Sequence, residues 1–389
     1  MFALGATGGV GQMTVRKLAT SGEVSDIVIA GRNPDGAQRV ASELGAKATS
    51  LQVDAADEGR LASLAAGSDI LLNAAGPDFR VALPAVRAAV KTGVHYCDVS
   101  ADGPSTEKAL ALDAAAQAAG VTALLGIGTD PGVSNLMLMH AARQFDRVEE
   151  LRSCWVLPLV SWGNPKEVLA GWRAAGHADA SWQTMMRAVR RKVRVYRDGR
   201  LTEVDPIEDA VRITIPRGGR VTAQPLSGPL PITLPRTLPG VRSVSHLMSL
   251  LPPQLNEPYC DLGRRVAAGE LDESAAACAL YEMVVDDPDR WLADPEGHGS
   301  EFVVWAEATG TKQGQQVRYK CWPVGGWEGT ATALATAALK ILRGEVSRRG
   351  VLSPESCLEP MSFFREAAQH APEKRPGGEL LDESFEVLE

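Results

Sequence analysis

Long apolar runs, a basic excess and paired cysteine motifs are all missing from this chain of 389 residues. No apolar run approaches the roughly 20 residues that a membrane-spanning helix requires, so we expect no membrane partner. No basic segment precedes the first apolar residues, which predicts a buried first strand rather than a signal peptide, and hence a cytoplasmic protein. The net charge of −8 argues against a nucleic-acid partner, because phosphate backbones require a basic surface.

Metal-binding and several catalytic signatures are missing as well. The six cysteines occur without CxxC or Cys/His ligand spacing, which predicts reduced, mostly buried thiols and no metal site. The sequence contains no GxSxG, GxxxxGK[ST] or HExxH motif, so hydrolase, kinase and zinc-peptidase functions lose their usual anchors. None of the five tyrosines precedes a lysine by four residues, which argues against the short-chain dehydrogenase mechanism.

What is present is a glycine-rich segment at the amino end, Gly5-Ala6-Thr7-Gly8-Gly9-Val10-Gly11. It follows the short apolar run 2–4 and precedes a helical pattern over 10–19. Glycines allow a tight strand-to-helix turn and a close approach of the backbone to phosphate, while the helix N-terminus offers free N–H groups. We therefore predict a dinucleotide pyrophosphate site that includes Gly5, Thr7, Gly8, Gly9, Val10 and Gly11. The first strand is expected to be unusually short.

Apolar runs then alternate with helical patterns along the first third of the chain. The runs cover residues 26–30, 49–53, 69–73, 94–98 and 121–126. This alternation predicts an α/β fold, with a Rossmann-type doubly wound parallel sheet. We assign it to residues 1–147, completed by 322–370, where an alanine-rich helix is expected over 329–342.

The alternation breaks near residue 148, where the sequence becomes rich in tryptophan and then strand-like and studded with proline. We predict a second α+β domain over 148–321, built on a mostly antiparallel sheet and serving substrate binding and dimerisation. Strands are expected near 151–159 and 317–321. Residues 371–389 read as a mobile acidic tail.

Ligands of such sheets bind beyond the carboxyl ends of the strands, which directs attention to the polar residues there. An NAD enzyme usually places an acid about 20 residues beyond the glycines, whereas this chain has Arg32, followed by Asn33. A guanidinium pairs with a 2′-phosphate, so we predict NADP(H); the alternative is a solvated turn arginine. Further cofactor contacts are predicted at Asp54, Asn73, Ala74 and Gly76, for which ordinary turn chemistry is the alternative.

Two polar clusters end the next strands, His95-Tyr96-Cys97-Asp98 and Gly128-Thr129-Asp130-Pro131-Gly132-Val133-Ser134-Asn135. With GATGGVG, IAGRN and the stretch 73–98, they give the chain a resemblance to the saccharopine dehydrogenase (saccharopine reductase) family, which includes carboxynorspermidine dehydrogenase. The segments Leu230–Arg236 and Gly329-Thr330-Ala331 extend the resemblance over most of the chain. Members that act on saccharopine typically continue the DPG motif with Asp and His, whereas Ser134 and Asn135 stand here.

The resemblance implies a catalytic role for Asp130 in acid/base chemistry at a C–N bond. Reduction of an imine requires a protonated nitrogen, and Asp130 would hold that iminium, while Tyr96 or Asp98 relays the proton or fixes the substrate. A helix cap or an Asp-Pro-Gly turn is the alternative for Asp130, and packing with local hydrogen bonds is the alternative for the other two.

The leading hypothesis is an NADP(H)-dependent oxidoreductase that reduces an imine, or oxidises a secondary amine, of an amino-acid conjugate. A basic run from Arg187 to Arg200 indicates a carboxylated substrate, although most of the run is expected to be a solvated face. A homodimer is expected. The alternatives are an enoyl (C=C) reductase of the same fold and a non-catalytic NADP-binding redox sensor.

Overall fold

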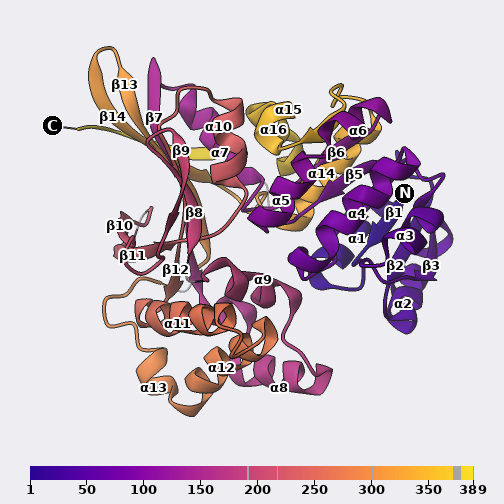
Figure 1. Ribbon diagram of the computed structural model, residues 1–389, viewed down its shortest axis with the longest axis horizontal. Helices are drawn as coiled ribbons and strands as arrows, with labels where there is room; N and C mark the ends of the chain where they lie inside the picture. The colour runs from indigo at the N-terminus through magenta and orange to yellow at the C-terminus, as the bar shows by residue number, and fades with distance from the viewer. Residues whose placement is uncertain (191, 217, 300, 371–377, 389) are drawn as a thin grey trace. The chain divides into compact units, whose positions relative to one another are not determined.

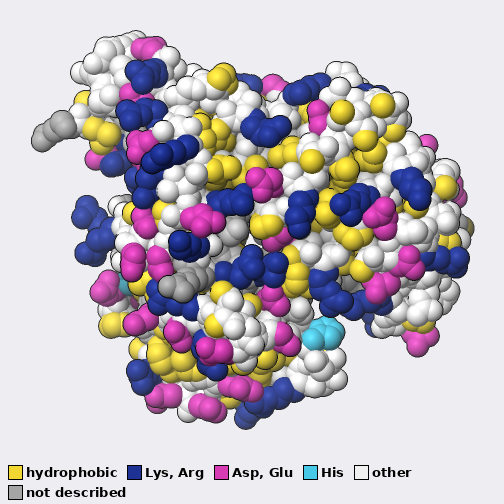
Figure 2. All heavy atoms as spheres, in the orientation of Figure 1, with side chains coloured by type: hydrophobic (Ala, Val, Ile, Leu, Met, Phe, Trp, Pro, Cys, Tyr) yellow, Lys and Arg dark blue, Asp and Glu magenta, His cyan; other side chains and the backbone are white. Residues whose placement is uncertain are grey.

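The computed structural model describes residues 1–190, 192–216, 218–299, 301–370 and 378–388. The chain forms two compact units, Met1–His140 with Pro323–Asp382 and Ala141–Trp322 with Glu383–Glu389. The first unit thus includes a late segment of the chain, from Pro323 to Asp382. Lysine, arginine and acidic side chains are interspersed over the face drawn in Figure 2.

The first unit is built on a seven-stranded sheet with the order β15-β6-β5-β4-β1-β2-β3 (Figure 1). Every neighbouring pair runs parallel, so the predicted Rossmann-type sheet is confirmed. The central strand, β1, has only three residues, and it pairs with β2 and β4. The strands are β1 (Phe2–Leu4), β2 (Ile27–Gly31), β3 (Ala48–Gln52), β4 (Ile70–Asn73), β5 (His95–Asp98), β6 (Thr122–Leu124) and β15 (Gly350–Leu352).

Two groups of helices pack on this sheet, because parallel strands need crossover connections that cover both faces. Neighbours in the first group are α2, α1, α14 and α16, and neighbours in the second are α3, α4 and α5. The helices are α1 (Gly9–Thr20), α2 (Pro34–Leu44), α3 (Glu58–Ala65), α4 (Asp78–Thr92), α5 (Gly103–Leu110), α6 (Asp113–Ala118), α7 (Val133–Ala142), α14 (Thr330–Leu342), α15 (Pro354–Cys357) and α16 (Pro360–Gln369), with a 3-10 turn, η1 (Gly45–Lys47).

The second unit is built on a nine-stranded sheet with the order β10-β11-β12-β7-β13-β14-β16, to which β8 and β9 are attached beside β12. It is mostly antiparallel, as predicted; the long central pair β12 and β7 is parallel. The strands are β7 (Arg147–Pro158), β8 (Val193–Arg197), β9 (Arg200–Val204), β10 (Val211–Thr214), β11 (Arg220–Pro225), β12 (Ser243–Leu251), β13 (Val303–Lys312), β14 (Gln315–Pro323) and β16 (Leu381–Val387).

A layer of helices completes the second unit, and its core is aromatic. Trp182 is fully buried, and its ring meets those of Trp172 and Tyr281. Trp162, by contrast, is 39% exposed. The helices are α8 (Pro165–Ala175), α9 (Ala180–Ala188), α10 (Leu230–Thr237), α11 (Asn256–Ala267), α12 (Glu273–Asp286) and α13 (Pro288–Trp291), with 3-10 turns η2 (Leu159–Trp162) and η3 (Pro253–Leu255).

The expectation of a mobile tail does not hold for Leu381–Val387, because these residues form β16 at the edge of the second sheet. The ring of Phe385 lies 4.7 Å from that of Tyr319 and beneath the ammonium group of Lys312. Because acidic residues alternate with its apolar residues, the sequence of this segment resembles an acidic tail, and the strand was not predicted. Residues 371–377 and 389, which belong to the same expected tail, lie outside the described residues.

Some side chains of the basic run form ion pairs within the second unit. Arg187 pairs with Glu273, and Arg197 pairs with Asp209. Arg191 lies outside the described residues. Across the described ranges, no helix is long and apolar enough to cross a membrane, and no cluster of His, Cys, Asp and Glu is arranged to hold a metal.

Candidate active site

The glycine loop joins β1 to α1, and its backbone leaves no room for side chains at two positions. Gly5 has a φ of +71°, and a Cβ atom there would lie 2.3 Å from the Ala75 nitrogen. A Cβ atom on Gly11 would lie 2.2 Å from the Gly5 oxygen. These two glycines therefore let α1 and the loop after β4 close on the end of β1.

The outer glycines of the loop are less crowded. Gly8 and Gly9 are exposed, and no described atom lies within 4 Å of a Cβ placed on Gly9. Gly8 precedes α1, where no side chain of the described residues caps the helix and the first turn carries no acid. The N–H groups of this turn, including that of Val10, thus form an open cradle of the kind that binds phosphate.

The end of the second strand, β2, carries a cation. Arg32 is exposed, and its guanidinium has no hydrogen-bond or ion-pair partner among the described residues, while its backbone oxygen accepts from Gln52. The Asn33 side chain is already engaged, because its oxygen caps α2 by accepting from the Gly36 nitrogen at 3.0 Å. Thr7 lies beside Gly36, so the glycine loop and this strand end meet.

The other predicted cofactor residues divide between the loop after β4 and an outlying turn. Ala74 donates its backbone N–H to the Leu4 oxygen, which places Ala74 and Gly76 beside the glycine loop. Asp54 is exposed and accepts from the Ala56 nitrogen at 2.9 Å, the turn chemistry that was the alternative for it.

A buried chain of hydrogen bonds links the ends of β4 and β5. Asn73 Nδ2 donates to the Tyr96 hydroxyl at 3.0 Å, and that hydroxyl donates to Asp98 Oδ2 at 2.8 Å. Asp98 Oδ1 accepts from the Gly126 and Ser100 nitrogens. Burial raises the pKa of Asp98 to about 6, although the hydrogen bonds oppose this shift. The Asp98 carboxyl can thus take up or release a proton near neutral pH.

Sequence reasoning missed a second carboxyl beside this chain. Asp78 begins α4 and accepts from the Ala101 nitrogen at 2.7 Å. Burial, with the nearby charges of Asp98 and Asp102, raises the pKa of Asp78 to about 7. An acid at a helix start resembles an ordinary cap, so only the approach of α4 to the end of β5 reveals it.

Asp130 lies in the turn between β6 and α7, where it is half-buried and accepts a short hydrogen bond from the Ser134 hydroxyl. The Ser134 hydroxyl therefore holds the Asp130 carboxyl in place. The preceding residue, Thr129, accepts from or donates to the Thr330 hydroxyl at 3.1 Å, which fixes the turn against the start of α14.

A further acid, Glu328, sits beside this turn and was also missed. The Thr129 hydroxyl donates to the Glu328 backbone oxygen at 2.8 Å. The Glu328 side chain is half-buried, and its Oε2 atom finds no hydrogen-bond partner in the described residues. Burial raises the pKa of this carboxyl. Glu328 is some 200 positions from Asp130 in the sequence, so no local pattern signals the pair.

The structure therefore brings together most of the predicted site residues in one unit. The Gly126–Gly132 segment joins the two polar clusters, because the Asp98 carboxylate accepts from Gly126 and its backbone oxygen accepts from Ile127. The ends of β1, β4, β5 and β6 thus meet at the carboxyl edge of the sheet, where ligands of doubly wound sheets bind.

Comparison with known proteins agrees with this geometry. Residues 1–124 match the family model for the saccharopine dehydrogenase NADP binding domain. A trans-acting enoyl reductase of Mycobacterium leprae is 31% identical over 153 residues, which is 38% of this chain and 37% of that protein. One from Mycobacterium tuberculosis is 35% identical over 101 residues, 25% of this chain and 24% of that protein. The match thus spans 37% of the length of the first of these relatives and 24% of the second.

One solved structure resembles the chain throughout. The apo saccharopine dehydrogenase (L-Glu forming) from Saccharomyces cerevisiae covers 99% of both chains with a TM-score of 0.65 and 17% sequence identity. At this identity the likeness establishes the fold. The fold of this chain is therefore similar to that of this saccharopine dehydrogenase, and residues 1–124 of the chain match the NADP-binding family model.

Proposed function

We propose that this chain, whose residues 1–124 match the family model for the saccharopine dehydrogenase NADP binding domain, is an NADP(H)-dependent reductase. The observation that supports this most directly is the open cradle at the start of α1, with Arg32, which has no partner among the described residues, at the neighbouring strand end. We assign the pyrophosphate to the cradle and the 2′-phosphate to the Arg32 guanidinium. NADPH, when bound, supplies a hydride.

The proposed substrate is an imine of an amino-acid conjugate. Hydride addition forms a C–H bond at the imine carbon. The π electron pair of the C=N bond moves to the nitrogen, which becomes the nitrogen of a secondary amine. The carbon is electrophilic only while the nitrogen is protonated, so the substrate reacts as a cation. The carboxylate of Asp130, held by Ser134, favours a cation at this edge of the sheet, and Glu328 adds a second carboxyl there.

The buried chain from Asn73 through Tyr96 to Asp98 is proposed to hold a proton for this step. The Tyr96 hydroxyl is fully buried and donates to Asp98 rather than outward. We therefore place it behind the reacting groups, where it keeps the Asp98 carboxyl in position. Asp130 is the group that we propose to contact substrate.

Enoyl reduction is the second candidate, and the names of the curated relatives favour it. Hydride addition to a conjugated C=C bond moves negative charge onto the carbonyl oxygen. Two carboxylates would oppose that charge, whereas a protonated acid would donate to it. The two reactions therefore require Asp130 in different charge states, which makes them separable by experiment.

The deciding experiment follows NADPH oxidation with matched substrates. One arm contains 2-oxo acids paired with primary amines, and the other contains enoyl thioesters. We expect turnover in the first arm and its loss, by about a hundredfold or more in kcat, in Asp130→Asn. Glu43→Gln, which removes an exposed carboxylate at the far end of α2, serves as the control. Turnover in the enoyl arm alone would replace the imine proposal, and NADPH binding without turnover in either arm would point to a redox sensor.

Two further features belong to the same proposal. A carboxylate on the substrate follows from the basic run, and the 2-oxo acids of the panel test it against uncharged aldehydes paired with the same amines. A homodimer is proposed for the assembled enzyme, and light scattering of the purified full chain measures it directly.

A further inference from the structure

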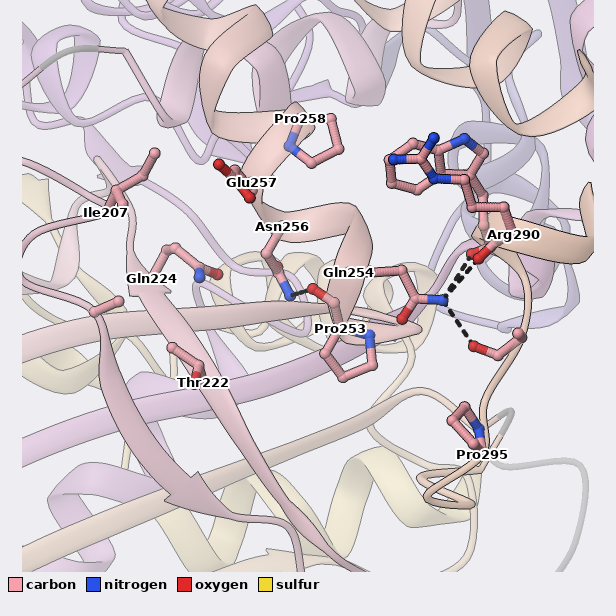
Figure 3. Close-up of a pocket in the computed structure, with 13 residues that line it drawn as sticks. Ile207, Thr222, Gln224, Pro253, Gln254, Asn256, Glu257, Pro258, Arg290 and Pro295 are labelled. Carbon is pink, nitrogen blue, oxygen red and sulfur yellow. Dashed lines mark hydrogen bonds between the residues drawn. The ribbon is translucent and has the colours of Figure 1, made fainter. Parts of the chain in front are cut away.

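A cavity of about 690 Å³ opens in the second unit, and none of its lining residues is one assigned above to cofactor or catalysis. Its walls come from β11, from η3 with the start of α11, and from α13 with the segment that follows it (Figure 3). Small-molecule sites typically measure roughly 300–1,000 Å³, so the cavity is large enough for an amino acid or a dipeptide.

Hydrogen bonds fix the rim of this cavity. Gln254 Nε2 donates to the backbone oxygens of Arg290, Trp291 and Ala293, which ties the segment after α13 to η3. Asn256 accepts from the Leu250 nitrogen at 2.7 Å and donates to Ser249, Leu250 and Pro253. Both carboxamides therefore hold the surrounding backbone in place, which gives the cavity a defined shape.

The wall contains a third carboxamide, that of Gln224. Gln224 lies on β11 and is only 6% exposed, yet its Oε1 atom has no hydrogen-bond partner among the described residues. An unpaired buried acceptor costs free energy that a ligand N–H or O–H group would recover. In Figure 3 this side chain points into the cavity from the same side as Glu257.

Two opposite charges also line the cavity without meeting each other. Glu257 and Arg290 are both exposed, and neither forms an ion pair within the described part of the chain. Figure 3 shows them on opposite sides of the space. The Arg290 guanidinium lies 4.5 Å from the centre of the Trp291 ring, which holds it at the rim. Ile207, Pro258 and Pro295 supply apolar parts of the wall.

We propose that this cavity is a binding site for a zwitterionic α-amino acid or dipeptide with apolar side chains. The ligand ammonium group donates to Gln224 Oε1 and faces the Glu257 carboxylate, while its carboxylate pairs with Arg290. The apolar side chain lies against Trp291 and the proline-lined wall. Because the site belongs to the second unit alone, it is separate from the proposed reaction and stands without it.

Calorimetry on the full chain tests the site with four probes. L-norleucine and norleucyl-norleucine carry both charges, whereas pentylamine and hexanoate each lack one charge of norleucine. We expect at least one of the two zwitterions to bind, and both single-charge analogues to bind about tenfold more weakly or not at all, since each loses one charged contact. The absence of binding by both zwitterions up to about 10 mM would refute the proposal, as would equal affinities for all four probes.

Variants locate the binding. Gln224→Leu, Glu257→Gln and Arg290→Gln should each weaken zwitterion binding by about tenfold. Arg265→Gln, which removes an exposed charge from the other end of α11, should leave it unchanged. Glu257 and Arg290 are exposed, so their variants keep the test decisive even where Gln224→Leu disturbs β11. Affinities that none of the three lining variants alters would overturn the assignment.

Discussion

Arg32 is the single residue on which the cofactor assignment depends most. Arg32→Ala should lower kcat/KM for NADPH by about ten- to a hundredfold, because a charge-assisted contact with the 2′-phosphate is lost, and should leave kcat/KM for NADH nearly unchanged. Steady-state kinetics with both cofactors measures this. Arg87→Ala, at an exposed arginine within α4, is the matched control. A proportional fall with both cofactors would contradict the assignment.

Asp78 provides a pH test of the buried carboxyls. Its pKa is raised to about 7 in the folded chain from a usual value near 4, so the native state binds this proton more tightly than the unfolded state does. The stability it contributes is therefore complete below about pH 4 and is lost as the pH rises to about 7. Asp78→Asn cannot ionise. We expect the free energy of unfolding of the variant to fall less than that of the wild type across that range. At pH 8 it should exceed the wild-type value by about 2 kcal/mol.

Chemical denaturation at several pH values measures this difference. The control is Glu43→Gln, which removes an exposed carboxylate at the far end of α2. A variant with the wild-type slope between pH 4 and 7 would show that Asp78 titrates normally.

At the scale of single residues, the sequence indicated which side chains lie at the strand ends better than it indicated what those side chains contact. Arg32 was recognisable because it replaces an expected acid. Asn33 and Asp54 lie where predicted, but their side chains bond to nearby backbone N–H groups. Asp78 and Glu328 were not recognisable, because their environment depends on segments that are distant in sequence.

The turn from β1 into α1 allows a paired test of the glycines. Gly9→Ala meets no described atom within 4 Å, so it should change the free energy of unfolding by less than about 1 kcal/mol while weakening NADPH binding through contact with the pyrophosphate. Gly11→Ala should destabilise the fold by about 2 kcal/mol or more, because its Cβ would strike the Gly5 oxygen. Fluorescence titration with NADPH and urea denaturation separate the two effects.

The contrast between the two variants is the informative result. If Gly9→Ala bound NADPH as the wild type does, the cradle would not hold the pyrophosphate. If Gly11→Ala were as stable as Gly9→Ala, the close contact between α1 and the loop would not support the fold.

Among the elements, the apolar runs predicted the central strands of the first sheet to within a residue or two at most ends. They succeed because buried parallel strands read as continuous apolar runs. β15 was not predicted, because three residues are too few to show a strand pattern in the sequence. In the structure it pairs with β6 through Val351 and its neighbours. β16 was missed because Asp382, Glu383 and Glu386 outweigh its apolar residues in composition.

Across the whole chain, the division into two units was visible where the strand–helix alternation stops. The cavity of the second unit was not, because Gln224, Glu257 and Arg290 come from three separate segments and form no local pattern. Each unit has its own hydrophobic core, one around the parallel sheet and one around Trp182. Units with separate cores can respond separately to a ligand that binds only one of them.

NADPH should therefore stabilise one unit selectively. We expect calorimetry to resolve two unfolding transitions, of which saturating NADPH raises only that of the first unit. At a concentration of about 100 times Kd, mass action adds about 2.7 kcal/mol to the stability of the binding unit. Of the eight tryptophans, only Trp327 belongs to the first unit, so most of the tryptophan emission reports the second.

Trp327→Phe assigns the transitions. Its ring is buried, meets Phe364, and donates one hydrogen bond to the Leu380 oxygen, so phenylalanine keeps most of the packing. The variant should lose the fluorescence change of the NADPH-sensitive transition and keep that of the insensitive one. A single transition that NADPH shifts as a whole would instead mean that the two units unfold as one cooperative body, and a ligand of the cavity would then stabilise the NADPH-binding unit too.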